Sequence, residues 1–188
     1  MRKSVPAAFS AVLLASASLL SLAPFSAFAA EPAKLATLTE AWKGGPAREQ
    51  GADYCVQEAR FSSGHLLIIG RTKAGEVNLA LGIPGGGLPV GERWKVTVTA
   101  EGAAPRDRQA VAASKGLLVV GMGFDTEFYD RLKRGKTLNL KSAADDIAFQ
   151  LSGTAKALGE LEKCAAGLPD LKAGGKVASG APGGAGAP

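Results

Sequence analysis

The sequence is poor in the residues that many enzyme and metal sites use. It has one histidine, His65, with two cysteines and two tryptophans among 188 residues. A histidine-based zinc site needs several nitrogen or sulfur ligands, so this composition argues against one. The chain also lacks the G-x-S-x-G elbow of many serine hydrolases and the spacing of an EF-hand loop. We therefore expect no catalytic residues, no metal and no cofactor.

Long apolar runs are also scarce, and the main one lies at the start of the chain. Two basic residues precede an apolar run at 7–22, and Ala27-Phe28-Ala29 then supplies the small residues that a signal peptidase reads. Residues 1–30 are therefore predicted to be a signal peptide, cleaved near Ala29 or Ala30. No later stretch approaches the length that spans a bilayer. We expect a periplasmic or secreted protein with no transmembrane segment after cleavage.

The charge of the chain is mildly basic. The net charge of +5 falls to +3 when the signal peptide and its two basic residues, Arg2 and Lys3, are removed. The other basic residues are scattered among acidic ones and lack interleaved aromatic residues, so nucleic-acid binding is not expected. A periplasmic or surface protein is the expected partner, and the sequence leaves the oligomeric state unknown.

Composition divides the mature chain into three parts. Residues 31–52 form a mixed N-terminal extension, and residues 53–167 have the length and apolar content of a single β-rich domain. Residues 168–188 are mostly Gly, Ala and Pro and are predicted to be a disordered tail. Cys55 and Cys164 lie near the two ends of the domain. In an oxidising compartment two cysteines most simply pair, which would tie the last element to the first strand.

The domain reads as short strands followed by two short helices. Alternation places Val77, Leu79 and Leu81 on one face of a strand, and Trp94, Val96 and Val98 on one face of another. Further strands are expected near 55–61, 65–72, 109–113, 117–122, 136–140 and 147–151. The fold class is therefore α+β, with a mostly antiparallel sheet or sandwich and two short helices in the C-terminal half.

Both helices have start and stop signals. Asp125 is expected to cap a helix that ends at Arg134, with Phe124 packing back as a hydrophobic staple and Gly135 as the C′ residue. Ser152 or Thr154 is expected to cap the final helix. The inner face of that helix is predicted to carry Leu158, Leu161 and Ala165.

Two surfaces are candidates for partner binding. Gly85, Gly86 and Gly87 resemble a phosphate-binding loop in composition, but a strand follows them where such a loop needs a helix, so a connection or contact loop is expected. The second surface is the basic edge, defined as Arg131, Lys133, Arg134 and Lys136. It is either a solvated helix end whose cations complement the helix dipole or a docking face for an acidic partner.

Several stretches resemble the invasion-associated locus B family of small secreted or periplasmic proteobacterial proteins. They are Leu88-Pro-Val-Gly-Glu-Arg-Trp94, Leu132-Lys-Arg-Gly-Lys-Thr-Leu138 and Phe149-Gln-Leu-Ser-Gly-Thr-Ala-Lys-Ala-Leu158, and the resemblance covers residues 64–164. It implies a mostly β periplasmic or surface-associated accessory protein, with some members linked to host-cell entry, and it supplies no catalytic residues. The family carries a further mid-domain cysteine pair, where this chain has Ala110 to Ala113 and Met122.

Three functions stay open on the sequence alone. The favoured one is a non-enzymatic accessory or binding protein, envelope- or host-interaction-associated, that acts through a surface of the β-domain. The alternative is a small periplasmic hydrolase or hydrolase inhibitor that uses the loop around Ser63 and His65, which requires His65 to reach a serine and a carboxylate. The third is a structural envelope protein whose Gly/Ala/Pro tail acts as a tether.

Overall fold

The structure is a computed structural model of the chain and describes residues 33–49 and 51–170. The predicted signal peptide and most of the predicted tail lie outside these residues. In chain order the elements are β1 (Lys34–Ala36), β2 (Lys43–Glu49), β3 (Ala52–Arg60), β4 (Leu66–Arg71), β5 (Val77–Gly82), β6 (Arg93–Ala100), β7 (Arg106–Ser114), β8 (Leu117–Gly123), α1 (Thr126–Arg134), β9 (Thr137–Lys141), β10 (Asp146–Gln150) and α2 (Thr154–Ala166).

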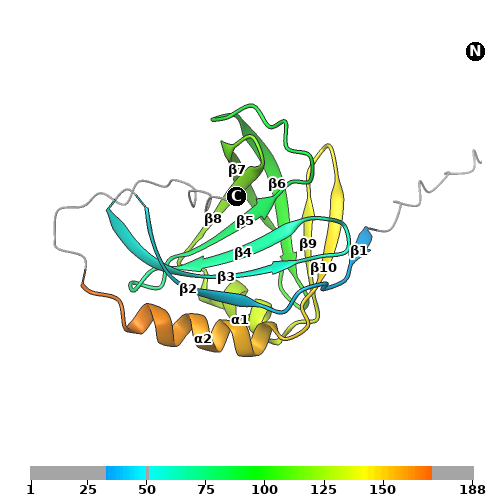
Figure 1. The fold of residues 1–188 in the computed structure, drawn as a ribbon. Helices are drawn as coiled ribbons and strands as arrows, with labels where there is room; N and C mark the ends of the chain where they lie inside the picture. Colours follow the sequence, from blue (N-terminus) through cyan, green and yellow to red (C-terminus); the bar gives the residue numbers. More distant parts are fainter. Residues whose placement is uncertain (1–32, 50, 171–188) are drawn as a thin grey trace, which may run out of the picture. The chain divides into compact units, whose positions relative to one another are not determined.

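The strands form one ten-stranded sheet in the order β1-β10-β9-β6-β7-β8-β5-β4-β3-β2. Every pairing is antiparallel except that of β1 with β10. The sheet curls strongly into a half-barrel (Figure 1). The expected α+β class with a mostly antiparallel sheet is confirmed. Of the two expected forms, the sandwich is wrong, because a single curled sheet encloses the core where a sandwich needs two sheets.

Alternation decides which side chains face the concave core. Val77, Leu79 and Leu81 are buried along β5, as predicted from their period of two. On β6, Val96 and Val98 are buried and Trp94 is half-buried, while Lys95 is exposed on the opposite face. The hydrophobic pattern therefore sets the register of both strands, because a shift by one residue would turn these side chains outward.

Helix α2 packs against β2, β3 and β4, and α1 lies beside α2 and contacts β6 (Figure 1). Asp125 caps α1 as expected, since its Oδ1 accepts a hydrogen bond of 2.9 Å from the Phe128 backbone N–H. The expected staple is wrong because the Phe124 side chain is 65% exposed. The expected C′ glycine is also wrong in conformation, since Gly135 has an extended backbone with φ −74°.

The last helix begins differently from the prediction. Its N-cap is Gly153, which has the left-handed φ of 76° and makes no side-chain cap, so neither Ser152 nor Thr154 serves as the cap. The predicted inner face is confirmed, because Leu158, Leu161 and Ala165 are all buried. A disulfide joins Cys164 of α2 to the fully buried Cys55 of β3, with 6.0 Å between the Cα atoms. It holds the end of the helix against the sheet.

The domain begins earlier than residue 53. β1 and β2, which lie in the expected N-terminal extension, form the two edges of the sheet. The chain between them crosses from one edge to the other, where Leu38 forms a β-bridge with Phe61 and Ser62 donates a backbone hydrogen bond of 2.8 Å to the Thr37 carbonyl. This segment, residues 37–42, brings the two edges of the curled sheet together. The Phe61 and Phe149 rings pack where the edges meet, with centroids 4.9 Å apart.

The domain also continues past residue 167. Leu168 is buried, and Asp170 forms an ion pair of 2.7 Å with Lys73. The start of the expected tail therefore packs on the domain. Within residues 33–49 and 51–170, neither helix is long and apolar enough to cross a membrane.

Candidate functional site

An apolar cavity of about 290 Å³ opens on the concave side of the sheet. It lies at the end where β5 and β9 finish and β8 begins, whereas α1 follows the opposite end of β8. The helices therefore fill one end of the concave face and leave this end open. Six apolar side chains from the strands line it, namely Leu81, Trp94, Val96, Leu118, Leu140 and Ile147.

Two strand pairs that are separated in the sheet order, β5 with β8 and β9 with β10, contribute to the wall of the cavity. Leu81 and Leu118 are cross-strand partners in β5 and β8, and Leu140 and Ile147 are cross-strand partners in β9 and β10. Each pair faces the cavity because directly opposed residues in an antiparallel ladder point to the same side of the sheet. The cavity thus exists only because the sheet curls far enough to bring these two pairs into one site.

The Gly-rich loop borders this cavity. Ile83 and Leu88 flank the three glycines and line the cavity, while Gly85, Gly86 and Gly87 are exposed and all have positive φ. The loop is held against the turn between β7 and β8, because the Leu88 N–H donates to the Lys115 carbonyl at 2.9 Å. The glycines therefore allow the chain to reverse direction while Ile83 and Leu88 both point inward.

The cavity has a polar rim made by His65, Lys141, Ser142 and Asp145. Ser142 is engaged within its own turn, where its Oγ accepts hydrogen bonds from the backbone N–H groups of Ala144 and Asp145. Burial lowers the pKa of His65, and the negative charge of Asp145 opposes this shift in part. The imidazole is therefore neutral at neutral pH.

The Ser63 and His65 side chains lie within hydrogen-bond distance. Ser63 Oγ is 2.9 Å from His65 Nδ1, and the imidazole packs edge-on against the Phe149 ring. A serine–histidine–carboxylate arrangement also needs a carboxylate on the other ring nitrogen. In the described part of the chain no carboxylate makes that hydrogen bond, and Asp145 affects the imidazole only through its charge. The geometry supplies two members of a triad.

Much of the basic edge is paired within the chain. Lys133 Nζ is 2.8 Å from Glu162 on α2, and Arg134 pairs with Asp130 one turn earlier on α1 at 3.1 Å. Arg131 and Lys136 are exposed beside them. Partner binding at this edge stays a prediction, and its strength would be limited because two of the four cations already have acidic neighbours.

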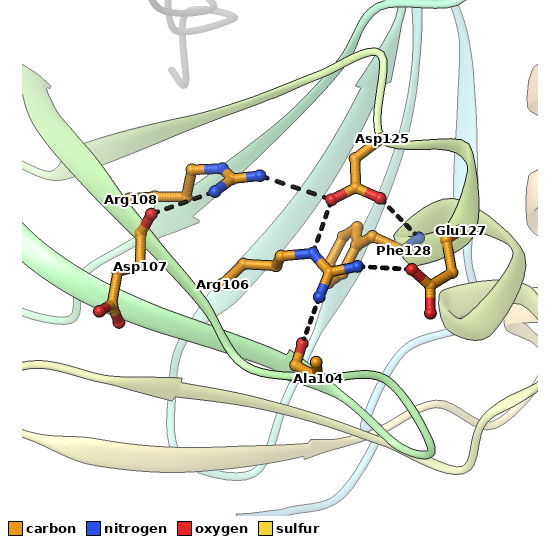
Figure 2. Close-up of polar contacts among 7 residues, drawn as sticks. All are labelled: Ala104, Arg106, Asp107, Arg108, Asp125, Glu127 and Phe128. Carbon is orange, nitrogen blue, oxygen red and sulfur yellow. Dashed lines mark hydrogen bonds and ion pairs between the residues drawn. The ribbon is translucent and has the colours of Figure 1, made fainter.

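Arg106 and Arg108 form an internal network with the start of α1 (Figure 2). Arg106 Nε donates to Asp125 Oδ2 at 2.8 Å, and its guanidinium also reaches Glu127 at 2.9 Å, while Arg108 approaches the same Asp125 oxygen at 3.4 Å. The hydrogen bond from Arg106 lowers the pKa of Asp125. These two arginines thus hold the start of α1 on β7.

Sequence reasoning found the Gly-rich loop and the Ser63–His65 pair but missed the cavity that lies between them. A signal was present, since alternation puts Leu79 and Leu81 on one face of a strand, and Trp94 and Val96 on one face of another. The pattern does not show which of these residues the helices cover and which they leave open.

Among the residues that the structure describes, no three His, Cys, Asp or Glu side chains are grouped so as to hold a metal ion.

The fold and the cavity define a β-rich α+β protein with an apolar site at one end of a curled sheet. A comparison with solved structures finds a weak structural resemblance to the crystal structure of invasion-associated protein B from Bartonella henselae. The two chains share 21% sequence identity over 64% of this chain and 89% of that one, with a TM-score of 0.46. No protein-family model and no curated protein matches the chain.

Proposed function

We propose that the protein is a non-enzymatic periplasmic or secreted binding protein whose ligand site is the apolar cavity. The observation that carries this proposal is a preformed cavity with an apolar wall and a few polar groups at its rim, which is the usual composition of a small-molecule site. The disulfide is consistent with an oxidising compartment. The predicted signal peptide supports the same location.

The test uses two neighbouring alanines in the turn between β9 and β10. Ala144 borders the cavity and is exposed, so Ala144→Phe should narrow the mouth without disturbing the core. Ala143 is also exposed but does not line this cavity, which makes Ala143→Phe the matched control. The wild-type chain and both variants are purified from the cells that secrete them and examined by native mass spectrometry.

We expect the wild-type chain and Ala143→Phe to retain a small molecule that Ala144→Phe loses. Equal retention by all three proteins would place the ligand elsewhere. A bound protein with no small molecule would favour the accessory role at another surface, and charge reversal of the basic edge would then show whether that edge makes the contact.

A second function, a small hydrolase, is favoured by one observation, the 2.9 Å contact between Ser63 and His65 at the cavity rim. If this pair is catalytic, Ser63→Ala and His65→Ala should each abolish hydrolysis of short p-nitrophenyl esters. If the protein only binds, the wild-type chain and both variants should all hydrolyse these esters at the background rate.

A further inference from the structure

The cavity is small, which limits the size of its ligand. At roughly 30 Å³ for a water-sized group, about ten methylene-sized groups would fill it. Its volume of about 290 Å³ lies at the lower end of ligand pockets. A lipid with two long chains is therefore too large, whereas one short alkyl chain or one ring system fits.

The charges around the rim disfavour an anionic head group. Lys141 is the rim's cation, and its Nζ lies 3.3 Å from the Asp146 carboxylate. Asn139 also donates a hydrogen bond of 2.8 Å to Asp146, which holds that carboxylate in place. Asp145 adds a second negative charge next to the pair. An anion placed near Lys141 would also face Asp145 and Asp146, so this exposed rim offers it little net attraction.

A cationic head group gains little from the same rim. Asp145 is exposed, and pairs between exposed charges are weakened by solvent and contribute about 0–1 kcal/mol. An ammonium group held at an apolar mouth would lose part of its hydration in exchange. The rim therefore favours an uncharged head group over either ion.

His65 can recognise a hydroxyl group. A neutral imidazole has one nitrogen that donates and one that accepts a hydrogen bond. Nδ1 makes a hydrogen bond with Ser63 Oγ. If Nδ1 is the donor in that bond, Nε2 is an acceptor, and if Nδ1 is the acceptor, Nε2 is a donor. A hydroxyl group both donates and accepts, and it can therefore pair with Nε2 whichever way the contact with Ser63 is oriented.

We propose that the cavity binds a small uncharged amphiphile, with an apolar body of about ten heavy atoms and a hydroxyl group held at the rim by His65. This inference rests on the proposed function and names its ligand class. The apolar body would lie against the two cross-strand pairs, Leu81 with Leu118 and Leu140 with Ile147. The head group would stay near the turn between β9 and β10.

The experiment compares 1-octanol, octanoate and octylammonium, which share one alkyl chain and differ in the charge of the head group. Trp94 lines the cavity and serves as the fluorescent reporter. The other tryptophan, Trp42, is changed to Phe so that emission comes from Trp94 alone. Circular dichroism checks that the Trp42→Phe chain is folded. Calorimetry on the chain that keeps Trp42 compares the affinities of the same three probes.

We expect a saturable change with 1-octanol, and binding about tenfold weaker for both ions, which corresponds to roughly 1.4 kcal/mol. The change should be lost in Ala144→Phe and kept in Ala143→Phe. His65→Phe, which keeps an aromatic ring beside Phe149 but removes the hydrogen bond, should weaken 1-octanol binding about fivefold.

Two results would overturn the inference, and they differ in what they leave standing. If an ion binds as tightly as 1-octanol and Ala144→Phe still abolishes binding, the head-group assignment is wrong but the cavity remains a binding site. If none of the three probes binds by fluorescence or calorimetry, the ligand class is wrong, and the loss or retention of a native small molecule in Ala144→Phe then decides the proposed function separately.

Discussion

Breaking the Cys55–Cys164 disulfide tests how strongly α2 depends on its covalent link to β3. The two cysteines are 109 residues apart in the sequence. In the chain-entropy account, a cross-link that closes a loop of this length stabilises the fold by about 5 kcal/mol. Single domains are commonly stable by only about 5–15 kcal/mol. We therefore expect loss of the bond to remove at least about a third of the stability of the domain.

The assay is urea unfolding followed by circular dichroism, for the oxidised chain, the reduced chain and the Cys55→Ala/Cys164→Ala variant. With a slope of about 2 kcal/mol per molar urea, a loss of about 5 kcal/mol lowers the midpoint by about 2.5 M. Reduction keeps both sulfur atoms, whereas the double variant also removes the buried Cys55 sulfur, so the variant should be the less stable of the two. A loss below about 1 kcal/mol on reduction would refute the reasoning, because the cross-link would then not restrain the unfolded chain.

Three further predictions follow from individual contacts. Asp125→Asn keeps a cap but removes the charge that faces Arg106. The pKa of Asp125 is lowered in the folded state, so the wild-type chain should have a higher unfolding midpoint than the variant, with the full difference above about pH 4. This difference should be lost as the pH falls below about 4. Gly44→Ala should lower the free energy of unfolding in urea by about 1–3 kcal/mol, because the new Cβ would collide with the Val56 carbonyl oxygen. Gly45→Ala should be nearly neutral, since no atom lies within 4 Å of its Cβ. Equal losses for the two variants would contradict this reasoning. Charge reversal of the basic edge should leave 1-octanol affinity unchanged in calorimetry, since these residues do not line the cavity.

The local elements of this protein were predictable because their signals lie within a few residues of one another. The period of two along β5 and β6 identified the buried faces. The cap at Asp125 identified the start of α1. The prediction failed at Gly153, because a left-handed glycine replaced the side-chain cap that the neighbouring serine and threonine suggested.

The candidate site was predictable only in pieces. The Gly85–Gly87 loop and the Ser63–His65 pair attract notice by composition, but their relation to each other depends on strands that are distant in sequence. β5 pairs with β8 and β6 pairs with β9, and these pairings place Leu81, Leu118 and Leu140 around one cavity. No local pattern encodes such a pairing.

Local patterns in the sequence predict strands β3 to β10, the buried faces of β5 and β6, the two helices and the two cysteines near the ends of the domain, but not β1 or β2. Period, caps and composition act over a few residues, so they can be read along the chain. The folded chain adds three features that no local pattern predicts: the sheet curls into a half-barrel, residues 37–39 join its two edges, and one end of the concave face stays open. These features depend on contacts between residues far apart in the sequence, whose free energy is realised only when the whole sheet has formed.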